Sequence, residues 1–386
     1  MRHFDFLSDE DTGRLFHRSP QHFCAADDPG ILAVALGATL YSPATRPALA
    51  ADIARRADQG VLSSVVCLED SIADDALQQA EQNAVAQLRS YAQAGATKPL
   101  LFVRVRAAEQ IGAIIDGLGE YSWILTGFVL PKFTEQTGAA YLDAVIDASG
   151  RAGRGLLAMP VLESPEVIYA ENRVAELIGV RDLLDKYRAT VLAVRIGATD
   201  FSAAYGLRRA RDLTVYDVRI LADVIADVVN VLGRADGSGY VVTGPVWEYF
   251  SGAERMFKPQ LRYSPFAEHS ERALRAELIA MDLDGLIREV ALDKANGLTG
   301  KTVIHPTHVA AVHALSVVTH EEYCDAVDLL GTNGGGGVAT SAYRNKMNES
   351  KPHSAWARRV MNRAHVFGVA NPSTSFVDLL GAGLNQ

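Results

Sequence analysis

The chain has 386 residues and a formal net charge of −9 at pH 7. Hydrophobic residues make up 48% and charged residues 22%, which supports a sizeable core and excludes wholesale disorder. The acidic balance excludes the basic face that nucleic-acid binding needs, but it leaves room for a local basic pocket that takes an acidic metabolite.

We expect no signal peptide, because residues 1–14 are acidic and lack the apolar segment of one. No stretch approaches about 18 consecutive apolar residues, so we expect no membrane span. The three cysteines, Cys24, Cys67 and Cys324, are far apart and contain no Cys-x-x-Cys pair, which fits buried thiols in a reducing compartment. These features predict a cytoplasmic protein.

Short apolar runs alternate with longer segments of helical composition along most of the chain. Near-continuous runs of Val, Ile, Leu and Phe are typical of strands buried on both faces. Eight of them, alternating with helices, predict a parallel sheet that closes into a (β/α)₈ TIM barrel. A doubly wound open sheet is the weaker alternative, because no Gly-x-Gly-x-x-Gly turn follows the first strand. The predicted strands are residues 38–44, 62–70, 99–107, 127–133, 155–164, 190–200, 239–247 and 301–309.

The two ends of the chain depart from this repeat. We predict an N-terminal helical extension over residues 1–37, the barrel over 38–325, and a glycine-rich hinge with a C-terminal helical arm over 326–386. The arm follows the glycines 334–337 and carries an apolar stripe at helical spacing. The stripe comprises Ala355, Trp356, Val360, Met361 and Ala364, and we expect the arm to cover an active-site mouth, that of a neighbouring subunit, with Lys346, Glu349 and His353 near the substrate.

Residues 295–302 satisfy a loose phosphate-loop pattern that ends in Gly-Lys-Thr. A phosphate loop leaves a strand and opens a helix, so that the helix N-terminus faces the phosphates. Here a helical segment precedes the pattern and a strand-like one follows it. We therefore predict a helix-to-strand turn.

Charged residues stand at the ends of most predicted strands. In a (β/α)₈ barrel the chemistry lies at the C-terminal ends of the strands, where the eight loops converge. A single such residue is more often a helix cap or part of a structural ion pair, but the set together favours an active site. In chain order these residues are Glu69, Asp70, Arg104, Arg106, Lys132, Glu163, Asp200 and His305.

Glu163 and Asp200 end neighbouring strands and should lie side by side. Two carboxylates, with the other positions left to water and substrate, suit Mg²⁺, or Mn²⁺ in its place. Zinc is disfavoured because no His or Cys stands beside either acid. Such an ion acts as a Lewis acid for an acidic substrate that chelates with its own oxygens, and Arg104 would stabilise the developing negative charge.

The motifs around these residues resemble the citrate lyase β-subunit-like group of the 2-keto-acid aldolase/citrate lyase superfamily. Seven segments over roughly residues 35–310 occur in the family order, among them VVCLEDSI, FVRVR, GFVLPK, VLESPEV and IGATDFSAAYGL. The resemblance implies a phosphoenolpyruvate-mutase-like barrel, a Mg²⁺ ion and reversible carbon–carbon cleavage. It implies acyl-CoA thioesters such as citryl-, malyl- or citramalyl-CoA as the substrate class, and a homotrimer or hexamer.

The resemblance also implies roles for individual residues. Glu163 and Asp200 match the metal ligands of the family, and Arg104 matches its substrate-binding arginine. Glu69 and Asp70 match its Leu-Glu-Asp acids, and either one is our candidate for the base that takes the substrate hydroxyl proton. Lys132 and Arg106 are the predicted substrate-binding residues.

Two departures from the family concern the substrate. Arg106 replaces the usual Asn, which adds positive charge to the pocket and predicts a more anionic substrate. The C-terminal segment lacks the usual Asp, and only Glu349 stands near its place.

Two other functions stay open. A class II aldolase that cleaves 4-hydroxy-2-keto acids typically carries a histidine after the second strand, where this chain has none. A barrel that binds a metabolite without turnover is favoured by the altered third strand and arm, whereas the intact Glu163–Asp200 pair argues against it.

Overall fold

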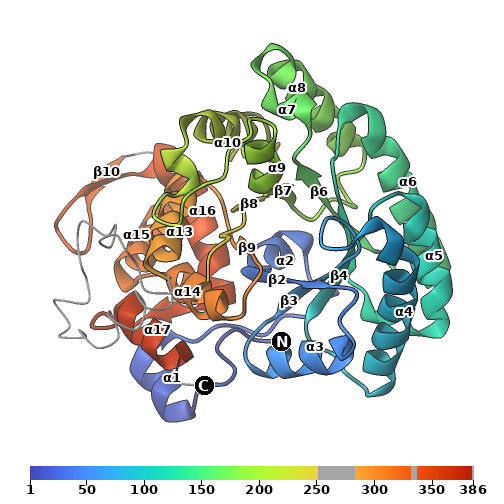
Figure 1. Cartoon of the computed structure of the whole chain (residues 1–386). Helices are drawn as coiled ribbons and strands as arrows, with labels where there is room; N and C mark the ends of the chain where they lie inside the picture. Colours follow the sequence, from blue (N-terminus) through green and yellow to red (C-terminus); the bar gives the residue numbers. More distant parts are fainter. Residues whose placement is uncertain (251–282, 332–336, 385–386) are drawn as a thin grey trace.

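Eight parallel strands form the centre of the computed structural model, which describes residues 1–250, 283–331 and 337–384 (Figure 1). Their order in the sheet is β8-β7-β6-β5-β4-β3-β2-β9. The ring closes beyond β8, where the Gly244 N–H donates to the Gly300 carbonyl and the Thr302 N–H donates to the Gly244 carbonyl, both at 3.1 Å. The predicted (β/α)₈ barrel, with helices at both ends of the chain, is confirmed. The strands are β2 Ala38–Pro43, β3 Ser63–Cys67, β4 Leu100–Arg104, β5 Gly127–Leu130, β6 Leu157–Leu162, β7 Val194–Ile196, β8 Val242–Thr243 and β9 Lys301–Val303.

Each of the eight strands lies within its predicted range but ends earlier than predicted. β3 stops at Cys67, before Glu69 and Asp70. β7 stops at Ile196, and Ala198–Ala203 form the short helix α9, so Asp200 lies in the first turn of a helix and not on a strand. Glu69, Asp70 and Glu163 therefore follow the strands, whereas Arg104 is the last residue of β4.

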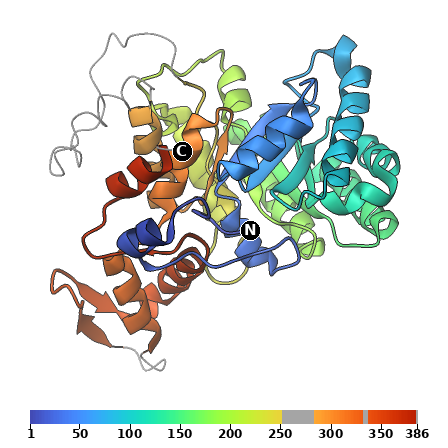
Figure 2. The ribbon, with the colours of Figure 1, turned by 90° about the horizontal axis from the view of Figure 1, so that it is seen from below.

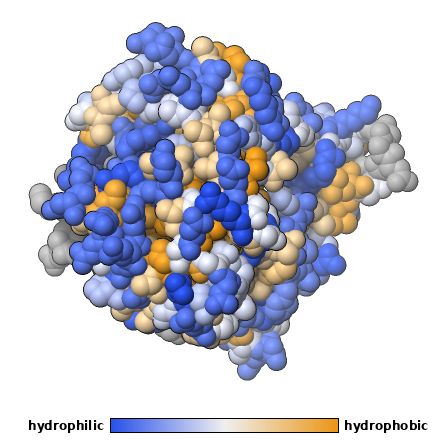
Figure 3. All heavy atoms as spheres, turned by 90° about the vertical axis from the view of Figure 1, so that its right-hand side faces the viewer, coloured by the Kyte–Doolittle hydropathy of each residue, from blue (hydrophilic) through white to orange (hydrophobic). Residues whose placement is uncertain are grey.

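The outer helices bury one apolar stripe each against the strands. In α10, the buried residues Leu221, Val224, Ile225, Val228 and Leu232 repeat at helical spacing. Hydrophilic side chains dominate the outer face in Figure 3, and apolar groups form separate spots among them. The helices of the wall are α3 Leu49–Asp58, α4 Leu77–Gln93, α5 Glu109–Leu118, α6 Glu135–Ala152, α7 Pro165–Ile168, α8 Ala170–Lys186, α10 Arg219–Leu232, α13 Leu283–Ala295 and α14 Thr307–Ser316, with the 3₁₀ turns η1 Asp74–Ala76, η2 Gly119–Ile124 and η3 Val215–Asp217.

The N-terminal segment closes the end of the barrel where the strands begin. It comprises α1 Asp9–Leu15, β1 Phe16–Arg18 and α2 Pro29–Ala35. Asp28 caps α2 through the Gly30 N–H, and Pro29 occupies the first helical turn, where it costs no hydrogen bond. Leu32 of α2 shares an apolar cluster with Leu62 and Leu100, which lie at the starts of their strands.

The C-terminal arm packs at this same end of its own barrel. Arg359 on α16 donates to the Gly233 carbonyl at 2.8 Å, in the loop that leads to β8. The buried side of α16 includes Ala357, Val360 and Ala364, whereas Trp356 of the predicted stripe is 37% exposed. The elements are α15 His320–Gly331, β10 Val338–Thr340, β11 Met347–Glu349, α16 Ser350–Phe367, β12 Val369–Ala370, which pairs with β1, and α17 Phe376–Leu384.

The stripe thus finds its partner within the chain, and another subunit is not needed to bury it. Lys346 pairs with Glu321 and Asp325 at 2.5 and 2.7 Å, and His353 accepts from the Glu349 N–H at 3.1 Å. These three residues lie on the arm, away from the strand ends of their own barrel. The β10–β11 pair projects from the body of the molecule (Figure 2). Of the predicted hinge 334–337, only Gly337 lies among the described residues.

The turn at residues 295–302, the cysteines and the helix lengths bear on three further predictions. The phosphate-loop pattern is a turn, since α13 ends at Ala295 and β9 begins at Lys301. Cys67 is buried, but Cys24 is exposed and Cys324 is half-buried, so the prediction of three buried thiols is wrong. Every helix along the described ranges is too short or too polar to cross a membrane.

Two buried histidines link the N-terminal segment to the rest of this end. The His3 ring stacks on Phe367 at 4.3 Å and meets His313 edge-on at 4.5 Å. Its Nε2 lies 3.1 Å from the Ala35 carbonyl. Burial lowers the pKa of His3 to about 4 and that of His313 well below its usual value. Both rings are therefore neutral in the folded chain.

We expect the free energy of unfolding to fall as the pH drops from about 6.5 to 4, because the unfolded chain then binds protons that folded His3 excludes. His3→Phe keeps the ring packing and should reduce this pH slope by up to about 1.4 kcal/mol per unit. Urea unfolding of the wild type, His3→Phe and the exposed-site control His22→Gln between pH 7 and 4.5 measures the slopes. A slope that His3→Phe leaves unchanged would contradict this role for His3.

Candidate active site

Arg104 is the centre of a cluster of charged residues where the strands end. Its guanidinium Nη2 lies 2.7 Å from Glu163 Oε1 and 2.9 Å from Glu69 Oε2, with Asp70 Oδ2 further away at 3.7 Å. Burial alone would lower the pKa of Arg104, but the charges of Glu163 and Glu69 outweigh it and raise the pKa. Arg104 is therefore a fixed positive charge within a pocket of acids.

Glu163 follows β6 directly, and its side chain is almost fully buried. Its Oε1 accepts from Arg104 and also from the Lys132 backbone N–H at 2.9 Å. Burial raises the pKa of Glu163 to about 7, and the nearby Asp200 charge adds to this against the pull of Arg104.

Gly197, at the end of β7, makes room for this carboxylate. A Cβ at Gly197 would lie 2.3 Å from Glu163 Oε2 and 2.4 Å from Glu163 Cβ, distances that real contacts do not reach. Glycine is thus required at position 197 because the Glu163 side chain lies so close to it, and not because of its backbone angles.

Asp200 brings the second carboxylate to the same place. The two acids are near enough to interact directly, and burial and the Asp70 charge raise the pKa of Asp200. Two adjacent carboxylates with raised pKa values repel each other, and a bound cation would relieve this repulsion. The donors are hard oxygens, which fit Mg²⁺ or Mn²⁺. Among the described residues no group of three or more His, Cys, Asp or Glu could hold a metal, so these two acids would leave positions for water and substrate.

Lys132 holds the remaining two acids. Its Nζ lies 2.6 Å from Glu69 Oε1 and 3.3 Å from Asp70 Oδ1. Its backbone has φ +46°, a left-handed conformation that is unfavourable for a residue with a side chain. This turn aims the Lys132 N–H at Glu163, so the residue fixes both parts of the cluster.

The charges of the cluster do not cancel. Arg104 and Lys132 supply two positive charges, and Glu69, Asp70, Glu163 and Asp200 supply four negative charges, which leaves −2 when all are ionised. One divalent cation would balance the cluster.

These residues border a cavity of about 490 Å³ where the strands end. Glu163, Arg104, Asp200 and Asp70 line one part of it. Lys132 and Glu69 are not among the lining residues, and no histidine is among the lining residues that the structure describes. The other lining residues include Tyr41, Ser42, Cys67, Ser71, Val161, Arg195, Thr199, Glu248, Thr302 and Ile304.

Two predicted residues lie elsewhere. Arg106 does not line the cavity: its Nη2 donates to the Ile72 carbonyl at 2.7 Å and its Nη1 to Asp74 at 2.5 Å, which holds the loop after Glu69. His305 lies with Nδ1 2.8 Å from Thr307 Oγ1, and its ring stacks on Phe250. Both side chains have local partners, and neither is among the residues that line the cavity.

The prediction missed Tyr41, Arg195 and Thr302 as cavity residues. Tyr41 and Thr302 are indistinguishable in the sequence from other polar residues of buried strands. Arg195 did carry a signal, because it is a charged residue in the middle of the apolar run 190–200.

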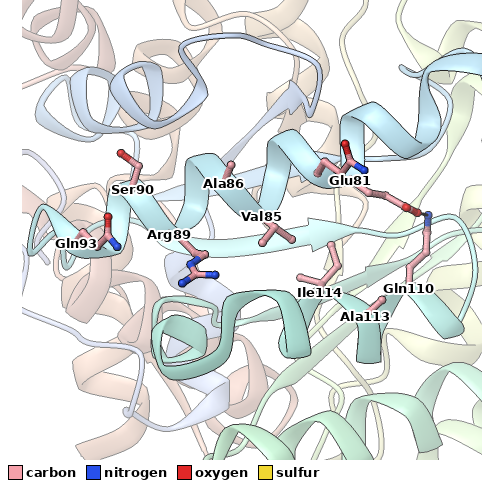
Figure 4. A pocket seen from close by; sticks show the side chains of 10 residues that line it. Glu81, Val85, Ala86, Arg89, Ser90, Gln93, Gln110, Ala113 and Ile114 are labelled. Carbon is pink, nitrogen blue, oxygen red and sulfur yellow. Dashed lines mark hydrogen bonds between the residues drawn. The ribbon is translucent and has the colours of Figure 1, made fainter.

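A second hollow of about 630 Å³ lies on the outer wall between α4 and α5 (Figure 4). Val85, Ala86 and Ile114 give it an apolar floor, and Glu81 Oε1 accepts from Gln110 Nε2 at 2.5 Å across its rim. It lies on the outer side of two helices, whereas the strand ends carry the acids. We therefore place the chemistry in the barrel.

A model of the C–C bond lyase family of the TIM-barrel fold matches residues 30–369. The chain belongs to this family. The match confirms the predicted reaction class, and the protein is a carbon–carbon lyase. No curated protein matches the sequence of this C–C bond lyase.

Solved structures with the same fold come from distant sequences. A citrate lyase from Burkholderia xenovorans superposes with a TM-score of 0.60 at 14% identity, over 89% of this chain and 96% of that chain. A malate synthase from Haloferax volcanii, solved as a ternary complex with pyruvate and acetyl-CoA, gives a TM-score of 0.52 at 13% identity, over 84% and 90%. At these identities the likeness concerns the fold of the C–C bond lyase.

We expect Gly197→Ala to displace Glu163, because the added methyl group would occupy the place of its carboxylate. The loss of stability should be about 1–3 kcal/mol, as for other overpacked sites. Gly155→Ala, where nothing lies within 4 Å of the new methyl group, is the matched control. Thermal unfolding of both variants measures the difference, and equal midpoints would show that the contact is not tight.

Proposed function

We propose that this lyase cleaves, or in reverse forms, a carbon–carbon bond of a small anionic hydroxy acyl compound with the help of Mg²⁺. The observation that carries the proposal is the adjacency of Glu163 and Asp200 beside Arg104 at an open cavity. Glu163 and Asp200 would hold the ion. When bound, the ion supplies Lewis acidity and a place for the oxygens of a keto acid.

The protein residues supply the proton transfer and the charge stabilisation. Cleavage needs a base that removes the substrate hydroxyl proton while the electron pair of the breaking bond moves onto the departing enolate. Asp70 is the better of the two predicted bases, because it lines the cavity and is half exposed, whereas Glu69 is locked between Arg104 and Lys132. Arg104 would stabilise the negative charge on the substrate oxygens.

An acyl-CoA thioester is the proposed substrate class. Support comes from the resemblance to citrate lyase β-subunits and from the Haloferax malate synthase, whose structure contains pyruvate and acetyl-CoA. The class II aldolase is the alternative, but it typically needs a histidine base and the described part of the cavity wall has none.

Assembly into a homotrimer or hexamer stays a proposal. The β10–β11 pair exposes Val338 and Met347 at 60% and 56%, which gives an apolar contact surface away from the barrel. Through it the arm could reach a neighbouring subunit even though α16 packs on its own chain.

A substrate screen tests the function. Purified protein with Mg²⁺ is incubated with citryl-, malyl- and citramalyl-CoA and with 4-hydroxy-2-keto acids, and products are identified by mass spectrometry. Cleavage of a thioester supports the proposal, and cleavage of a free hydroxy keto acid favours the aldolase. Binding of several compounds without any product would favour a barrel that binds a metabolite without turnover.

Glu163→Gln and Asp200→Asn should each abolish Mg²⁺ binding, because each removes one of two anionic ligands without changing side-chain size. Titration calorimetry with MgCl₂ measures the affinity. Asp212→Asn, in the loop after α9, is the control for a generic loss of negative charge. If both variants bind Mg²⁺ as tightly as the wild type, the site is not where we place it.

Arg104→Lys should reduce turnover roughly 10²-fold or more, the effect of removing one preorganised donor. Lysine keeps the charge but cannot contact Glu69 and Glu163 while also reaching the substrate. Steady-state kinetics on the substrate found in the screen, with circular dichroism as a check on folding, gives the answer. Near-normal turnover would assign charge stabilisation to another residue.

A further inference from the structure

Arg195 enters the interior of the barrel from β7 and is only 1% exposed. Its Nη2 donates to Thr302 Oγ1 at 2.6 Å, and its Nη1 makes long contacts of 3.5 and 3.6 Å to Thr39 Oγ1 and Met159 Sδ. Its Nε has no hydrogen-bond partner. Tyr41 also hydrogen-bonds the guanidinium. All of these partners are neutral, and among the described residues no Asp or Glu forms an ion pair with Arg195.

Other buried arginines of this chain have a carboxylate. Arg104 contacts Glu163 and Glu69, Arg173 contacts Asp227 at 2.9 Å, and Arg209 contacts Glu289. Burial of an unpaired charge is costly, and proteins normally compensate it with an opposite charge. Arg195 differs from these arginines because no described carboxylate balances its charge.

Arg195 also faces open space. It lines the 490 Å³ cavity together with Arg104, Tyr41 and Thr302. The Tyr41 ring lies beneath the guanidinium, 5.5 Å from its carbon, and Tyr41 also interacts electrostatically with Arg104. The two arginines thus share one cavity, but only Arg104 has its charge matched by the protein.

A second unpartnered polar atom lies beside Arg195. Thr243 on β8 is aligned with Arg195 in the parallel register, so both side chains point to the same face of the sheet. The Thr243 hydroxyl is buried and has no partner. A guanidinium and a hydroxyl with unused donors therefore stand next to each other inside the barrel.

We propose that Arg195 is a substrate-binding residue that takes a second anionic group, a carboxylate or a phosphoryl-type group, at the floor of the cavity. The substrate then carries two anionic groups, one held near Glu163, Asp200 and Arg104 and the other on Arg195. The position of the first group rests on the proposed function, whereas anion binding by Arg195 does not. The extra positive charge that the sequence suggested at Arg106 is supplied by Arg195.

The first arm of the test uses EDTA, so that no divalent ion contributes. Malonate and inorganic phosphate should each raise the thermal midpoint of the wild type more than chloride of equal ionic strength, because they supply the missing counter-charge. Arg195→Met should lose this difference. Arg173→Met removes a buried arginine of α8 that is far from the cavity lining, so it should be less stable but should keep the response to both anions.

The second arm uses Mg²⁺ and compares pyruvate with 2-oxoglutarate and 3-phosphonopyruvate by titration calorimetry. All three carry the same 2-oxo acid end, and the last two add a carboxylate or a phosphonate. The wild type should prefer at least one of these over pyruvate by roughly 10-fold or more, as expected for a hydrogen-bonded charge pair. Arg195→Met should bind pyruvate and Mg²⁺ as before but lose the preference, and Arg195→Lys should keep part of it. A preference for 2-oxoglutarate would identify the second anionic group as a carboxylate, and a preference for 3-phosphonopyruvate would identify it as a phosphoryl-type group.

An anion preference that depends on Arg195 in either arm supports the proposal. Its absence from both arms in the wild type overturns it, and this result needs no folded variant. A preference that persists in Arg195→Met likewise overturns it. If Mg²⁺ fails to bind while the EDTA arm succeeds, the proposed function fails alone. If Mg²⁺ and pyruvate bind but neither arm shows an anion preference, the Arg195 proposal fails alone.

Discussion

The contact of the Arg104 guanidinium with Glu163 and Glu69 is the interaction on which the site depends. It joins β4, β6 and the loop after β3 through one side chain, at 2.7 and 2.9 Å. A buried guanidinium needs these acids, and the buried acids need the guanidinium, because each charge alone would be costly so far from water. The left-handed turn at Lys132 and the glycine at 197 are the local adjustments that let Glu163 reach this position.

The charged groups of the cavity do not balance one another. The cluster around Arg104 has an excess of two negative charges, and Arg195 has an unmatched positive charge within the same cavity. The two imbalances have opposite sign. A divalent cation at the cluster and an anionic group of the substrate at Arg195 would offset them. The unbalanced charges of the cavity therefore fit a site that binds a cation together with an anionic ligand.

The sequence predicted the barrel and most of the cavity acids because both depend on local patterns. Apolar runs separated by helices define the strands, and an acid such as Glu163 at the end of a run marks the loop above it. Arg106 could not be placed in this way, since its side chain turns to the carbonyls of a neighbouring loop that only the folded chain brings near. Arg195 needed the inward or outward direction of each strand residue, and the short β7 shows no alternation from which to read it.

The two ends of the barrel divide stability and chemistry between them. At the end where strands begin, α2, the His3–Phe367 stack and α16 form an apolar layer with two neutral histidines, and the buried charge of Lys301 is paired with Glu289 and Asp293. At the other end the buried guanidinium of Arg195 has no carboxylate partner among the described residues, and the Thr243 hydroxyl has no hydrogen-bond partner. Apolar burial at the first end can offset the unfavourable desolvation at the second, because both act on one cooperative unit. The arm therefore belongs to the stabilising end of its own subunit, and any contact it makes with another active site is an addition to that structural role.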